Sequence, residues 1–163
     1  MQFSTFIRQA DKAVRDDRGA GIIELALGLP IMLVLLVGMI DASRFIAARI
    51  DLEQAAQRTT DYALAKRPDN SDDATYLRTE AASAAGVPTG NVTAEIFLEC
   101  NGVRQTNFDT ICATGETTAR FINISITRQV NTLFDWQAAA HLFGSQVFGS
   151  SITVTGNSLV RFQ

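Results

Sequence analysis

One carboxylate stands inside the most apolar stretch of the chain. Glu24 is the only ionisable residue between Gly19 and Ile40, and the stretch has about the length that a bilayer-spanning helix needs, roughly 20 residues. Placing a charged group in lipid is costly, so an ionisable residue in a membrane helix is by default a candidate functional site. The chemistry that such a lone carboxylate offers is ion pairing with a cation.

The rest of the chain offers little for catalysis. His141 is the only histidine, and a lone histidine among aromatic residues is usually structural. No nucleophile elbow, HExxH zinc motif, P-loop or dinucleotide fingerprint is present. The net charge is −3, so no basic surface indicates nucleic acid. We therefore expect a protein that is not an enzyme, needs no cofactor and binds no nucleic acid.

The two cysteines, Cys100 and Cys112, predict a disulfide. In an oxidising compartment so close a pair is more often a disulfide than a metal site, and its spacing is not that of a CxxC redox pair. The spacing of acidic residues from Asp69 to Glu80 partly matches that of a calcium-binding loop, but Ala74 stands where that loop needs glycine. We expect no metal site there and a helix start instead. Oxidation of the cysteines and calcium binding are left open by the sequence.

Glu24 is positioned by what the sequence predicts to be a long helix. Residues 20–40 are the expected transmembrane helix, and Pro30 within it predicts a kink. From Asp41 the pattern becomes amphipathic, which predicts a continuation over residues 41–66 before Pro68 ends it. The residues expected on its apolar side are Ala42, Phe45, Ile46, Leu52, Ala55, Ala56 and Ala63, and Asp41 is expected on the polar side.

The start of this helix carries a pattern of its own. The residues RGAGIIE, at positions 18–24, resemble the processing site of type IV filament proteins. Pro30, the leucine–valine run, Gly38 and the later stretch LEQAAQRTTDYALA extend the likeness over residues 18–66. This segment resembles the TadE-like pseudopilins of tight-adherence (Tad) pilus systems.

The resemblance implies a minor pilin, or pseudopilin, that acts in pilus assembly at initiation or at the tip. Gly19 and Ala20 then flank the prepilin peptidase cut, and residues 1–19 are a cytoplasmic leader that is removed. Glu24 becomes the fifth mature residue, where it can pair with the free amine of a neighbouring subunit. Implied partners are the peptidase, other pseudopilins and the major pilin, the inner-membrane assembly platform and the lipid bilayer.

The remaining residues, 67–163, predict a small head on the periplasmic side of the bacterial inner membrane, and the whole chain reads as α+β. One helix and three strands are expected, over Asp72–Ala85, Val92–Leu98, Arg120–Val130 and Ser151–Phe162. Gly156 is expected to interrupt the last strand with a bulge or turn. Residues 133–143 predict either a short helix or a packed loop. The strands are expected to form an antiparallel sheet laid on the long helix.

A second interpretation is a signal-anchored extracytoplasmic module unrelated to filaments. Its head would bind a ligand or an envelope partner, and its helix would be only a tether. In that protein Glu24 has no task, and the mature chain keeps residues 1–19.

Overall fold

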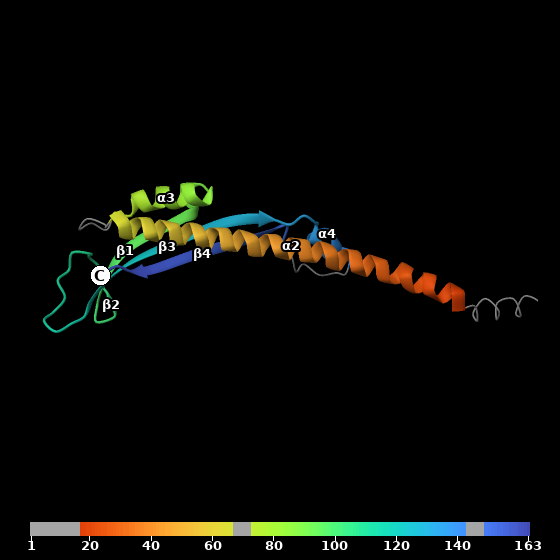
Figure 1. The fold of residues 1–163 in the computed structure, drawn as a ribbon, viewed down its shortest axis with the longest axis horizontal. Coiled ribbons are helices and arrows are strands. Elements are labelled where there is room, and N and C mark those ends of the chain that lie inside the picture. The colour runs from red at the N-terminus through yellow and green to blue at the C-terminus, as the bar shows by residue number, and fades with distance from the viewer. Residues whose placement is uncertain (1–16, 67–72, 143–148) are drawn as a thin grey trace, which may run out of the picture. The chain divides into compact units, whose positions relative to one another are not determined.

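The computed structural model describes residues 17–66, 73–142 and 149–163 of the 163-residue chain (Figure 1). In chain order the elements are helix α2 (Asp17–Lys66), helix α3 (Thr75–Ala85), the 3₁₀ turn η1 (Thr89–Asn91), strands β1 (Val92–Cys100), β2 (Val103–Arg104) and β3 (Thr118–Asn131), helix α4 (Trp136–Leu142) and strand β4 (Ser151–Arg161). The fold is α+β, as the sequence predicts. The chain divides into two compact units, Met1–Asp41 and Ala42–Gln163.

In the first unit the described chain is the N-terminal part of α2. From Gly21 to Ile40 its residues are exposed or half-buried, although nearly all are apolar. By length and composition this helix is a candidate membrane span. An apolar helix without protein cover is what lipid would accommodate. Pro30 lies inside the helix, and the kink expected there stays a prediction.

The second unit is built on a four-stranded antiparallel sheet with the order β2-β1-β3-β4. Alternate residues of β1 and β3 are buried, so only one face of the sheet is covered. Ile96 of β1 pairs with Ile122 of β3 on that face, and Ile122 pairs with Val160 of β4. One hydrophobic core joins this face to α3 and to the second half of α2.

The buried residues of α2 recur every three or four positions and so form a stripe along one side of the helix. Some of the apolar residues that were expected on this side lie outside the stripe. The buried positions are Asp41, Ala48, Leu52, Ala55, Ala56, Thr59, Thr60 and Ala63. The expectation was correct for Leu52 and the three later alanines. It was wrong for Ala42, which is exposed, and for Ile46, which is 61% exposed, because both lie one position away from the stripe. It was also wrong for Asp41, which is only 3% exposed.

Gly156 does not interrupt β4. It pairs with Ile126 in the middle of a continuous strand. A Cβ atom at this position would lie 2.4 Å from the carbonyl carbon of Leu52 and 2.5 Å from the backbone nitrogen of Glu53. The prediction of a bulge or turn was therefore wrong, because glycine serves here to let the α2 backbone approach the sheet.

The second helix begins later than its sequence pattern suggests. Asp73 and Ala74 are not helical, and α3 starts at Thr75. The Thr75 backbone N–H donates to Asp73 Oδ1 at 2.9 Å. Hydrogen bonds from the Thr75 side chain and backbone hold the pKa of Asp73 below its ordinary value. Asp73 thus accepts a backbone N–H at the start of α3, one residue before the N-cap Ala74. Asp69 and the rest of residues 67–72 lie outside the described residues.

Candidate functional site

The expected processing site lies in the first turn of α2. The helix begins at Asp17, so Gly19 and Ala20 are its third and fourth residues. Residues 1–16, which make up most of the expected leader, lie outside the described residues.

Glu24 lies one helical turn after Ala20. Residues four apart share one face of a helix, and side chains lean towards the helix N-terminus. The Glu24 side chain is exposed, and within residues 17–66, 73–142 and 149–163 it makes no ion pair. A carboxylate in this position is available to a cation that approaches the start of α2.

The two cysteines form a disulfide, as the sequence predicts. The Cα atoms of Cys100 and Cys112 are 5.4 Å apart, and the bond ties the end of β1 to the connection that leads into β3. Glu116 lies close to both sulfurs, but sulfurs in a disulfide are not the thiolates that bind metals. The Glu116 carboxylate instead accepts a hydrogen bond from the backbone N–H of Ala113 at 2.9 Å.

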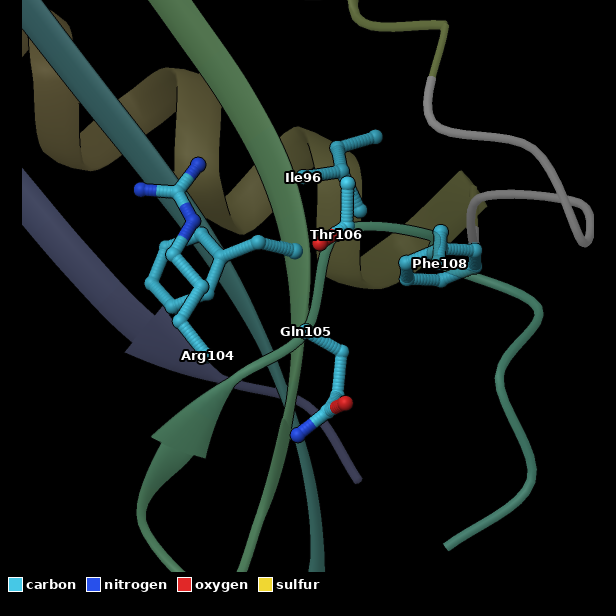
Figure 2. A pocket seen from close by; sticks show the side chains of 6 residues that line it. Ile96, Arg104, Gln105, Thr106 and Phe108 are labelled. Atoms are coloured by element: carbon cyan, nitrogen blue, oxygen red, sulfur yellow. The ribbon is translucent and has the colours of Figure 1, made fainter.

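One open hollow on the head was not predicted from the sequence. It has a volume of about 390 Å³ and is lined by Ile96, Phe97, Arg104, Gln105, Thr106 and Phe108. Figure 2 shows Ile96, Thr106 and Phe108 on one side of β1 and Arg104 on the other. The residues that line this open hollow therefore lie on both sides of β1.

Arg104 gives this hollow its only charge. Its guanidinium carbon lies 4.2 Å from the centre of the Phe97 ring, and its Nη2 donates to Glu95 Oε2 at 3.1 Å. The Phe97 ring in turn stacks on Phe121 at 5.3 Å. Both interactions of Arg104 are made on the exposed side of the sheet. The two-residue strand β2 that carries Arg104 is too short to produce a periodic signal in the sequence.

His141 has no catalytic setting among the described residues. It lies exposed in the last turn of α4. Asp135, the nearest acid before it in the sequence, accepts a hydrogen bond from the backbone N–H of Ala138 at 2.9 Å and so caps α4. The carboxylate thus has a structural task at the start of that helix.

Comparison with known proteins identifies the first part of the chain. Residues 19–61 match a family model described as TadE-like protein. Residues 19–61 are TadE-like. The TadE-like segment begins at Gly19, the residue before the expected cut, and ends at Asp61 within α2, so the sheet lies outside it. The TadE-like family connects the chain with the Tad pilus system. No curated protein and no solved structure matches this chain.

Proposed function

We propose that this TadE-like chain is a minor pilin, or pseudopilin, which takes part in Tad pilus assembly after cleavage by a prepilin peptidase. The observation that carries the proposal is the TadE-like segment itself, which starts at Gly19 and places Glu24 near the start of α2. Its candidate membrane span is the helix that would hold the subunit in the inner membrane.

The cut gives Glu24 its partner. Cleavage after Gly19 frees the α-amine of Ala20, which is largely protonated near neutral pH. In a filament the exposed Glu24 carboxylate meets the Ala20 amine of a neighbouring subunit. Away from water, an unpaired charge is much more costly than a paired one, so the pair acts mainly to fix the axial register between helices. This explains why a carboxylate is retained in an apolar segment.

Two features of the head support its place outside the cytoplasm. The Cys100–Cys112 disulfide suits the oxidising periplasm. The buried stripe of α2 packs on the sheet. The head therefore contacts the same helix that carries the TadE-like segment. We propose no catalytic activity for the chain, since His141 is exposed and the cysteines are joined to each other.

Deletion of the gene tests this function. We expect the deletion strain to lose surface pili, counted by electron microscopy, and expression of the full chain from a plasmid to restore them. A strain that remains fully piliated without the protein would overturn the proposal and favour the anchored binding module. Immunoblots with an antibody against the major pilin provide the control, because the strain must still make that subunit.

A further inference from the structure

Strand β4 is an open edge of the sheet. It is the last strand in the order β2-β1-β3-β4, and all 11 of its residues pair with β3. An exposed edge of this kind is usually protected by proline, lysine, a bulge or a short length. The segment Ser151–Arg161 contains neither proline nor lysine, and its register with β3 is continuous. β4 therefore offers a long and regular edge to a further strand.

The hydrogen bonds at the two ends of β4 show which of its backbone groups point outward. The Phe162 N–H donates to the carbonyl oxygen of Arg120 at 2.9 Å, and the Thr132 N–H donates to that of Ser150 at 3.0 Å. Bonded and non-bonded pairs alternate along an antiparallel ladder. The even-numbered residues of β4 therefore bond to β3, and the odd-numbered residues turn their N–H and C=O groups away from it. Between the two end residues, these are Thr153, Thr155, Asn157 and Leu159. Within the described residues, no strand pairs with this side of β4.

The helix on β4 presents apolar side chains beside this edge. On one flank of α2, Arg58 lines a hollow together with the end of α3, which contacts β1 and β3. On the other flank, the hydroxyl oxygens of Thr60 and Ser158 are 3.0 Å apart. Leu64 follows Thr60 by about one helical turn and Ile46 precedes it by about four turns, so both lie on the flank away from α3. Leu64 is 37% and Ile46 is 61% exposed.

A second copy of β4 does not fit against this edge. The α2 backbone lies directly on β4, because a Cβ atom on Gly156 would be 2.4 Å from the carbonyl carbon of Leu52. Paired strands lie about 4.8 Å apart, whereas the axes of packed helices stay about 8 Å or more apart. Two β4 strands side by side would bring their two α2 helices into the same space. The edge has room for an extended segment that carries no helix of its own over this position.

We propose that β4 binds an extended segment of a second protein, which adds a strand to the sheet. The backbone of this segment bonds to the outward groups of β4, as in other cases of strand addition. Because side chains alternate along a strand, its apolar ones meet Ile46 and Leu64, and its uncharged polar ones lie beside Thr153 and Asn157. The inference deepens the proposed function and rests on it, since the segment belongs to another protein of the assembling pilus.

Hydrogen exchange resolved to single amides tests the added strand directly. The full chain is compared as an isolated protein in detergent and within the complex extracted from piliated cells. In the isolated chain, the amides of Thr153, Thr155 and Asn157 should exchange fast and those of Val154 and Ser158 slowly. In the complex, exchange of the first group should slow by about tenfold or more, whereas that of the second group should not change.

Two variants separate the edge from the rest of the head. Thr155→Pro removes an outward N–H and no bond to β3, a change that edge strands tolerate. Asn157→Lys places a charge on the edge, and it keeps the test valid if the proline lowers the stability of the head. Thr93→Lys is the matched control, because Thr93 is also exposed and lies in the same row of the sheet, on β1. In the deletion strain, the two β4 variants should give about tenfold fewer pili than the control.

The outcomes separate this inference from the proposed function. Unchanged exchange of the outward amides in the complex would show that β4 stays open. Protection that depends on the concentration of the isolated chain would show that a second copy covers it, and either result overturns the inference. Full piliation with both β4 variants, in a strain that lacks pili without the protein, refutes the added strand and leaves the function intact. A deletion strain that stays fully piliated overturns the function, and the pilus source of the strand with it.

Discussion

A Cβ atom on Gly156 would lie 2.4 Å from the carbonyl carbon of Leu52. The backbone of β4 and the backbone of α2 are therefore in direct contact, with no side chain between them. Alanines at positions 55, 56 and 63 on the buried stripe allow the same close approach further along the helix. The helix and the sheet of the second unit thus meet through small residues, and the large aliphatic side chains of β1 and β3 fill the core beside them.

Gly156→Ala should strongly destabilise the head. Both obstructing atoms belong to backbone, which cannot move aside as a flexible side chain does, so we expect a loss of about 3 kcal/mol or more in the free energy of unfolding. Thermal unfolding of the full chain in detergent, followed by circular dichroism, measures the effect. Gly90→Ala is the control, since nothing lies within 4 Å of its Cβ position. Equal stability of the two variants would contradict the close approach.

A part-buried pair of hydroxyl groups joins α2 to β4 two residues after Gly156. Thr60 Oγ1 and Ser158 Oγ are 3.0 Å apart, and Thr60 donates its own proton to the carbonyl oxygen of Gln57 at 2.8 Å. Since that hydroxyl has one proton, Ser158 must be the donor across the interface. The pair adds a directional contact to the backbone contact at Gly156.

Thr60→Val should cost about 1 kcal/mol of unfolding free energy, because Ser158 loses its acceptor in a part-buried place. Combining it with Ser158→Ala should cost less than the sum of the two single changes, which a double-mutant cycle measures. Thr79→Val is the matched control: it removes a similar bond within a helix, from Thr79 to the carbonyl oxygen of Thr75, on an exposed surface. Fully additive effects of Thr60→Val and Ser158→Ala would argue against the contact.

Removing the disulfide should lower stability without unfolding the sheet. Cys100→Ser combined with Cys112→Ser removes the bond between two residues that are 12 positions apart in the sequence. We expect the free energy of unfolding to fall by about 2–3 kcal/mol. A reducing agent should lower the melting temperature of the wild-type chain and leave that of the double variant unchanged. If reduction lowers both equally, the stabilisation attributed to this bond has another source.

Local periodicity predicts those parts of the fold in which neighbouring residues decide the structure. Ile122, Ile124 and Ile126 alternate along β3, and this pattern alone predicts a strand with one buried face. The role of Gly156 could not be predicted in this way, because it depends on Leu52, which is far away in the sequence. The same holds for the contact between Thr60 and Ser158, which are 98 residues apart.

The pattern at the candidate site is local, and the roles of Gly19 and Glu24 stay predictions. Gly19 and Glu24 stand five residues apart at the start of an apolar run, so their pattern is local and visible in the sequence. The exposure of Leu133 and Phe134 was not predicted, because residues 133–143 were expected in a short helix or a packed loop. The structure has a short helix, α4, over Trp136–Leu142.

Glu24→Gln should leave membrane insertion intact and impair pilus assembly. The amide keeps the size of the side chain but has no charge to hold the Ala20 amine, so we expect pili to fall by a factor of about ten, as loss of roughly 1.4 kcal/mol would produce. Pili are counted in the deletion strain complemented with each variant. Glu53→Gln is the control, because that side chain pairs with Arg49 on an exposed surface of α2. Normal piliation with Glu24→Gln would remove the proposed role of the charge.

The N-terminus of the mature protein tests the central claim most directly. The intact mass of the chain, purified from its native membrane, is measured together with its N-terminal sequence. The proposed processing predicts a chain that begins at Ala20, with Glu24 as its fifth residue. A mature chain that still carries residues 1–19 would contradict it.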